Sequence, residues 1–149
     1  MMDALKIAKM EELLELEQCL LTSDIEKAIE ITQELIEMSK ADILRKIESY
    51  LKILLIHLIK QKVENRSTKS GNYSIKESSE QIKKINKRRK ASGWYASEEE
   101  LEEMCASVFG SAIGKASLEI FEGTLSESEI EEKINRKELI AQAIALMEN

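Results

Sequence analysis

Proline is absent from all 149 residues of the chain, and only five residues are glycine. Proline removes a backbone donor and clashes with the preceding helical turn, so its absence leaves almost nothing to interrupt a long helix. Aromatic residues make up only 4% of the chain, and no sustained run alternates β-branched with polar residues, as half-buried strands do. The sequence therefore predicts an all-α protein.

The length is sufficient to bury a core, and we expect a single helical domain over residues 1–149. The two cysteines, Cys19 and Cys105, lie far apart, belong to no CxxC motif and follow no secretory leader, which favours a reducing compartment. The longest apolar run, residues 53–59, is much shorter than the roughly 20 residues of a membrane span. We therefore expect a cytoplasmic protein that enters no membrane.

Apolar residues recur every three or four positions, which predicts a bundle of about five to seven helices around a long central helix. The central helix is expected over residues 42–63, because residues 51–59 are apolar nearly all round, as in a helix surrounded by others. Two helices are expected before it, over residues 3–21 and 24–38. The first is expected to be amphipathic, with Leu5, Leu13, Leu16 and Leu20 as its apolar residues; the expected inward side chains of the second are Ile25, Ala28, Ile29, Leu35 and Ile36.

After the central helix, residues 64–73 lack an apolar period and are rich in turn residues, so we expect an exposed loop. Helices are then expected over residues 74–92 and 97–123, and a last segment over 126–146, broken near Asn135. Helix starts are predicted where a serine precedes a glutamate by three positions, because the two side chains can cap free backbone N–H groups. These capping boxes are Ser23 with Glu26, Ser74 with Glu77, Ser97 with Glu100, and Ser126 with Glu129; Ser39 and Asp42 offer another cap, and Gly93 a helix end.

Charge divides the chain into thirds. Residues 1–39 hold three Lys or Arg against ten Asp or Glu, a net charge of −7, and residues 94–149 hold four against thirteen, a net charge of −9. The middle third, residues 40–93, holds fifteen against five, a net charge of +10. The simplest use of this pattern is association of acidic with basic helices, within the chain or between copies and partners.

A run of basic residues lies at the C-terminal end of the fourth expected helix, where the helix dipole favours cations whatever the function. As a solvated or partner-facing helix end it needs no ligand, whereas as a nucleic-acid or other polyanion site it would offer up to six phosphate contacts. Only Trp94 and Tyr95 could add stacking, and the acidic flanks would repel a polyanion. The run comprises Lys83, Lys84, Lys87, Arg88, Arg89 and Lys90.

His57 is the single histidine, and its neighbours one turn away are mostly apolar, so we expect a buried structural side chain. One histidine cannot form the usual zinc or facial-triad sites, and no nucleophile lies in a recognisable motif. The glutamates at 98–100, 102 and 103 read as the acidic first turn of a helix, since no Glu-x-x-His motif accompanies them. The sequence thus predicts no catalytic residue, metal or cofactor, and only His57 motivates an enzyme hypothesis.

Residues 48–60 read Glu-Ser-Tyr-Leu-Lys-Ile-Leu-Leu-Ile-His-Leu-Ile-Lys. This block resembles the Glu-Ser-x-Leu-x-x-Leu-Leu-x-His-Leu-Leu-Lys signature that the bacterial domain of unknown function family twenty-nine carries on a central helix. The resemblance extends over about residues 5–125, and includes the acidic segment 31–38 and the helix start 74–77 with Ile82. The signature residues here, expected to be structural, are Glu48, Leu51, Leu54, Leu55, His57, Leu58 and Lys60.

The chain departs from the family in the loop before residue 74, where a tryptophan and a Gln-Pro pair are missing, and the tail from Ser126 onward is its own. Membership implies a compact helical fold and a bacterial cytoplasmic setting, and brings no assigned activity. We therefore expect a non-enzymatic protein-interaction or scaffold module with a protein partner or a second copy as its target. Polyanion binding through residues 83–90 is the alternative.

Overall fold

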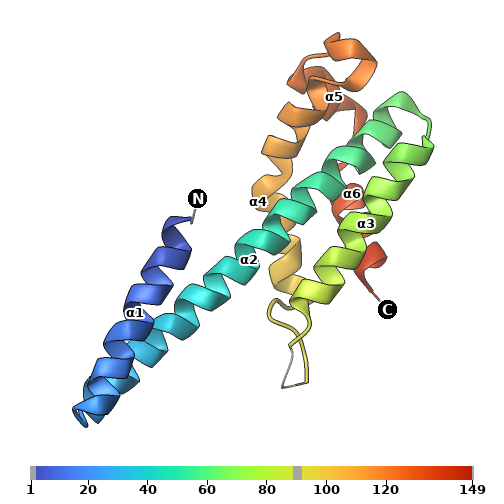
Figure 1. Ribbon diagram of the computed structural model, residues 1–149. Coiled ribbons are helices and arrows are strands. Elements are labelled where there is room, and N and C mark those ends of the chain that lie inside the picture. The colour runs from blue at the N-terminus through green and yellow to red at the C-terminus, as the bar shows by residue number, and fades with distance from the viewer. Residues whose placement is uncertain (1–2, 89–91, 149) are drawn as a thin grey trace. The chain divides into compact units, whose positions relative to one another are not determined.

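The computed structural model describes residues 3–88 and 92–148, without the side chain of Leu5. This part of the chain contains six α-helices, a short 3-10 helix and no strand, which confirms the all-α prediction (Figure 1). The chain divides into two compact units, residues 1–43 and residues 44–149. The boundary falls within helix α2 (Ile25–Glu64), and the expected single domain stays a prediction.

Unit 1 is an antiparallel pair made by α1 (Ala4–Leu21) and residues 25–43 of α2. The turn between them differs from the predicted capping box. Ser23 has a positive φ of 60°, and the Asp24 carboxylate instead accepts a hydrogen bond from the Lys27 N–H at 3.3 Å. Asp24 takes the cap because its carboxylate reaches the free N–H three residues on, whereas the left-handed Ser23 belongs to the turn.

The two predicted helices at 24–38 and 42–63 are one helix, α2. Ser39 and Asp42, expected to cap a new start, lie inside it. No glycine or proline occurs between residues 25 and 64, so the backbone ladder continues and these polar side chains have no free N–H group to cap.

In unit 2, most of the other helices pack against residues 44–64 of α2 (Figure 1). The prediction of a surrounded helix is confirmed there, since most side chains over residues 51–59 are buried; Ile53, 40% exposed, is an exception. The helices that complete the unit are α3 (Lys69–Asn86), α4 (Glu98–Ser117), η1 (Ile120–Gly123), α5 (Glu127–Lys133) and α6 (Arg136–Met147).

Helix α3 begins five residues before the predicted start. The Thr68 hydroxyl accepts a hydrogen bond from the Gly71 N–H at 3.0 Å and caps the helix inside the expected loop, so the Ser74 capping box is not used. Gly71 is buried, and a Cβ atom placed on it would lie 3.9 Å from His57 Nδ1. That distance is an ordinary contact, whereas the same Cβ would lie 2.9 Å from the Thr68 hydroxyl oxygen, so the glycine leaves room for the cap of α3.

Helix α3 also ends earlier than predicted, at Asn86 rather than near Ser92. The buried Asn86 side chain donates to the Ala96 carbonyl at 3.0 Å and accepts from the Ala96 N–H at 2.7 Å. The Tyr95 N–H donates to the Asn86 carbonyl at 2.8 Å, and Gly93 turns the chain with a φ of 102°. These bonds bring together the two ends of residues 87–95, which we call the hairpin loop. They stop the helix because the Asn86 carbonyl accepts from the Tyr95 N–H and not from the N–H that a continuing helix would supply four residues further on.

The remaining boundaries follow local signals more closely. The capping boxes at Ser97 and Ser126 are both present, and Asn135 caps α6 where a break was predicted. Helix α4 stops at Ser117 instead of continuing to residue 123. Phe121 and Glu122 adopt left-handed φ values of 46° and 59°, a conformation that continues no right-handed helix.

Candidate functional site

Unit 1 carries most of its large apolar side chains on its surface. Its buried core is small and comprises Cys19, Ala28 and Ile31, with Leu16 and Leu35 partly buried beside them. Because a two-helix layer can bury only one stripe of each helix, the other apolar side chains remain outside. The exposed ones are Ile7, Met10, Leu13, Leu14, Leu20, Leu21, Ile25, Ile29 and Ile36.

This placement corrects the sequence prediction for α2. Ile25, Ile29 and Ile36 were expected to face inward and are 55%, 54% and 60% exposed. Leu13 and Leu20, two of the apolar residues that predicted an amphipathic α1, are 54% and 56% exposed. The spacing groups these side chains correctly on one side of each helix, but the contact between the helices forms along neighbouring stripes.

Helix geometry places five of these side chains on one side of the pair. Each residue turns the helix by about 100°, so Ile25, Ile29 and Ile36 lie to one side of the stripe through which Ala28 and Ile31 contact α1. On the antiparallel α1, Leu13 and Leu20 lie to the same side of its own inner stripe. We call this surface the apolar face; it comprises Leu13, Leu20, Ile25, Ile29 and Ile36.

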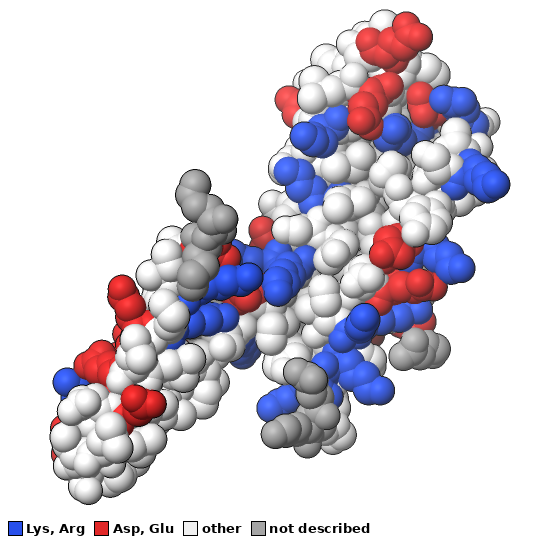
Figure 2. All heavy atoms as spheres, in the orientation of Figure 1, with Lys and Arg blue, Asp and Glu red and all other residues white. Residues whose placement is uncertain are grey.

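The opposite side of unit 1 is acidic. The same rotation places Glu15 of α1 and Lys27 of α2 there, and the two form an ion pair with an N–O distance of 3.2 Å. Glu34 and, less directly, Glu30 of α2 share this side. The end of unit 1 at the turn between α1 and α2 shows few charged side chains in Figure 2.

The inside of the helix pair is partly polar. Lys9 and Asp42 form an ion pair across it at 3.6 Å, and one carboxylate oxygen of Glu12 is buried. Desolvation, followed by the neighbouring Glu34 carboxylate, raises the pKa of Glu12. Charged groups therefore occupy positions that apolar residues fill in a strong helix pair, while leucine and isoleucine side chains lie outside.

The basic run is divided by the structure. Lys84, Lys87 and Arg88 are exposed, whereas Lys83 is half-buried. Figure 2 shows Lys and Arg side chains gathered beside the end of α3. The Arg88 guanidinium lies 5.9 Å from the centre of the Tyr95 ring, within cation–π range. The remaining members, Arg89 and Lys90, lie outside the described residues.

A cavity of about 470 Å³ lies beside the half-buried Lys83, between the end of α3, the hairpin loop and α6. Its lining includes the apolar side chains of Ile82, Leu101 and Ile144, with Trp94 at 47% exposure.

The signature residues on α2 separate into core and surface. Leu51, Leu54, Leu55 and Leu58 are each at most 2% exposed and support the expected structural role, whereas Glu48 is exposed. His57 is half-buried rather than buried as predicted. Its side chain lies where α3 begins, and this position leaves it partly in contact with solvent.

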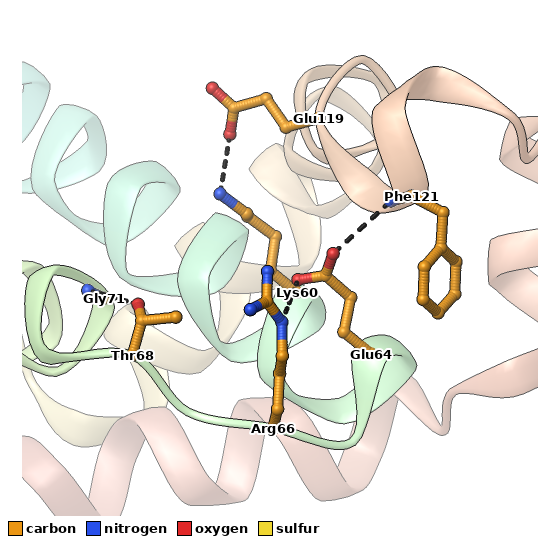
Figure 3. Close-up of polar contacts among 7 residues, drawn as sticks. All are labelled: Lys60, Glu64, Arg66, Thr68, Gly71, Glu119 and Phe121. Atoms are coloured by element: carbon orange, nitrogen blue, oxygen red, sulfur yellow. Dashed lines mark hydrogen bonds and ion pairs between the residues drawn. The ribbon is translucent and has the colours of Figure 1, made fainter.

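Lys60, the last signature residue, fixes the segment after α4 (Figure 3). Its ammonium group donates a hydrogen bond to Glu119 Oε2 at 2.9 Å. One turn further along α2, the Glu64 carboxylate accepts a hydrogen bond from the Phe121 N–H at 3.3 Å. Arg66 Nε lies 3.8 Å from Glu64 Oε1. The hydrogen bond from Lys60 lowers the pKa of Glu119. These contacts hold the left-handed residue pair that begins at Phe121, a conformation that costs about 1–2 kcal/mol per residue.

A small polar cavity of about 70 Å³ lies beside His57, lined by Lys60, Gln61, Glu64, Arg66 and neighbouring residues. This volume holds about two water molecules and is far below the roughly 300 Å³ of small-molecule sites. Desolvation, followed by the Lys60 charge, lowers the pKa of His57. The neutral imidazole therefore lies among charged groups that already bond to one another.

Two further site classes receive no support in the described part of the chain. Within residues 3–88 and 92–148, no group of three or more His, Cys, Asp or Glu side chains is placed to hold a metal ion. No described helix combines the length and apolar character that crossing a bilayer requires.

Comparison with known proteins finds no matching family model, and no curated protein or solved structure matches the chain either. The resemblance of residues 48–60 to family twenty-nine therefore stays a prediction. The functional argument rests on the geometry of the chain itself, and its least expected feature is the apolar face.

Proposed function

We propose that the protein is a non-enzymatic interaction module that binds a protein partner through the apolar face. The observation that carries this proposal is the exposure of Ile25, Ile29 and Ile36, each more than half exposed along one side of α2. Scattered surface leucines are ordinary, but a stripe at helical spacing continued by leucines of a neighbouring helix forms a contiguous patch. Such patches mark surfaces at which another helix docks.

The polar groups support a module without catalysis. At the signature end of α2, Lys60, Glu64, Arg66 and Glu119 bond to one another and to the backbone of Phe121. Their hydrogen bonds position η1, and the cavity beside them is smaller than a substrate site. These features fit a scaffold whose polar residues stabilise the fold.

Site-specific photo-crosslinking in cells tests the proposal. A benzophenone side chain replaces Ile36 on the apolar face, or Ala41, which is exposed on the acidic side, as the matched control. We expect a discrete adduct heavier than the chain's 17.0 kDa from position 36 and none from position 41. Ile29→Glu in the same chain should abolish the adduct. Equal adducts from both positions, or products of the chain's own mass only, would refute the interaction.

Polyanion binding remains a second candidate because Lys84, Lys87 and Arg88 are exposed and Arg88 lies over an aromatic ring beside Trp94. Charge and aromatic surface together are typical of single-strand binding. A labelled single-stranded oligonucleotide should bind at low salt. Its affinity should fall steeply as the salt concentration rises, and binding should be lost in Lys87→Glu/Arg88→Glu. Lys69→Glu/Lys76→Glu, in the first half of α3, is the control. Equal loss in both variants, or no binding at low salt, would exclude this function.

A further inference from the structure

We infer that the cavity of about 470 Å³ between the end of α3, the hairpin loop and α6 binds a small amphiphilic carboxylate, that is, an apolar body that ends in one carboxylate group. All the residues that line the cavity belong to unit 2, so this site is separate from the apolar face of unit 1. Its volume, its apolar floor, its half-buried ammonium group and its occupied backbone groups each point to this class of ligand.

The volume and the floor are those of a small-molecule site. Ligand cavities measure roughly 300–1,000 Å³, and this one has room for about 15 water molecules or a ligand of about 15 non-hydrogen atoms. The floor is apolar, since Ile82, Leu101 and Ile144 line the cavity and are buried. Trp94 adds an indole that is 47% exposed, and a ligand lying against it would remove that apolar surface from water.

A single ammonium group lies in this lining. Lys83 is half-buried, and in the described part of the chain its ammonium group forms no hydrogen bond or ion pair. Lys60 on α2 is also half-buried but is paired with Glu119 at 2.9 Å. Partly buried ion pairs are screened much less than exposed ones, so the ammonium group of Lys83 favours an anion that enters the cavity.

Two carboxylates limit the charge of that anion. Glu98 and Glu148 line the cavity but are exposed, so water screens them more than it screens Lys83. One ammonium group balances one carboxylate, whereas a phosphate monoester carries about −1.5 to −2 charges at pH 7. Its excess charge would lie near Glu98 and Glu148. The lining therefore favours a ligand with one negative charge.

Other polar groups of the lining are already used by the fold. The Asn86 side chain bonds to both backbone groups of Ala96, and the Asn86 carbonyl accepts from the Tyr95 N–H. A peptide in the cavity would bring amide groups that find few free partners there, and a buried amide without a partner weakens binding. We therefore expect a ligand whose only polar group is its carboxylate.

Trp94 is the single tryptophan and lines the cavity, so its fluorescence reports binding at this site. Decanoate titrated into the purified full-length chain should change the emission saturably, with a dissociation constant below about 1 mM. From octanoate through nonanoate to decanoate, each added methylene group should lower the dissociation constant up to about fourfold, because it leaves water for the apolar floor. No saturable change with decanoate up to about 1 mM would overturn the inference.

The role of the ammonium group is tested by Lys83→Met, which keeps an unbranched side chain without the charge. Decanoate should bind this variant about 10-fold more weakly, whereas decanol, with the same apolar body, should bind it as it binds the wild-type chain. Lys84→Met is the matched control, because Lys84 is exposed and does not line the cavity, and it should leave decanoate binding unchanged. Equal decanoate affinities in the wild type and Lys83→Met, or equal losses in both variants, would overturn the assignment.

Folding and the apolar face are controlled separately. Far-UV circular dichroism checks that each variant keeps its helices, and Lys83→Gln provides a polar replacement should the methionine alter the fold. Ile29→Glu, on the apolar face, should bind decanoate as the wild type does. Failure of decanoate binding leaves the crosslinking result at position 36 unaffected, and the absence of a crosslinked adduct leaves decanoate binding unaffected, because the two sites lie in different units.

Two further probes distinguish other occupants of the cavity. Decyltrimethylammonium carries a similar apolar chain with a positive charge, and tighter binding than decanoate would assign the site to Glu98 and Glu148 and overturn the inference. A short peptide that ends in two leucines and a free carboxylate shares the chemistry of the ligand but adds amide groups. Tighter binding of that peptide than of decanoate would make the cavity a peptide site and would also overturn the inference.

Discussion

Asn86 supports the most direct test of how unit 2 is held together. Its amide donates to the Ala96 carbonyl at 3.0 Å and accepts from the Ala96 N–H at 2.7 Å, and the two residues are 4% and 1% exposed. Asn86→Ala would remove both bonds and leave two buried backbone groups without partners. Each such group costs about 1–3 kcal/mol, so the free energy of unfolding should fall by about 3 kcal/mol.

Urea unfolding followed by circular dichroism measures this loss, and a thermal scan should show a melting temperature lower by about 10 °C. Trp94, the single tryptophan, lies in the loop that Asn86 closes, so its fluorescence reports the local effect. We expect its emission to change in the folded variant as the loop loosens.

Asn72→Ala is the matched control, because Asn72 also makes a side-chain hydrogen bond, with Gln61 at 2.8 Å, but is exposed. Exposed substitutions of this kind change stability by no more than about 0.5 kcal/mol. If Asn86→Ala is as mild as Asn72→Ala, the two bonds to Ala96 do not stabilise the fold, and our explanation of where α3 ends is wrong.

Three further predictions follow from local chemistry. Ser97→Ala and Ser126→Ala should each lower the free energy of unfolding by about 1 kcal/mol through loss of a helix cap, and the double variant should show their sum; unchanged urea midpoints would contradict the capping role. Burial raises the pKa of Cys105 to about 12, so at pH 8 a thiol reagent should modify Cys105 only when the chain unfolds. Cys19 lies in the smaller core of unit 1 and should react sooner. Rapid modification of both thiols in the folded chain would contradict their burial. The lowered pKa of His57 means that the unfolded chain binds the proton more tightly than the folded chain does. The contribution of the neutral imidazole to stability is therefore complete above about pH 6.5 and is lost as pH falls through the pKa of the folded state. NMR titration gives that pKa, and His57→Gln should remove this part of the pH dependence.

Local sequence signals set much of the secondary structure. The capping boxes at Ser97 and Ser126 and the break at Asn135 were predicted because each depends on side chains within three residues of the free N–H group they satisfy. Local signals also competed with one another, since the capping boxes predicted at Ser23 and Ser74 are not used and Asp24 and Thr68 cap those helices instead. Other boundaries depend on more distant partners. Helix α3 ends at Asn86 because of a bond to Ala96, and nothing near Asn86 in the sequence indicates that bond.

The candidate site shows the same division. Ile29 and Ile59 are both isoleucines at helical spacing on α2, yet one is 54% exposed and the other is fully buried. The difference lies in the number of other helices available to cover each segment. Periodicity identifies the side chains that share a face, but it does not specify what lies against that face.

The sequence by itself determined that this protein is helical and that residues 51–59 form a core, because the absence of proline and an apolar character nearly all round a helix leave few alternatives. It also determined the separation of charge into acidic and basic thirds. The tertiary structure alone decided that the isoleucines of residues 25–36 are largely surface rather than core. Burial depends on which elements are available to pack against a face, and only the arrangement of the whole chain supplies that information.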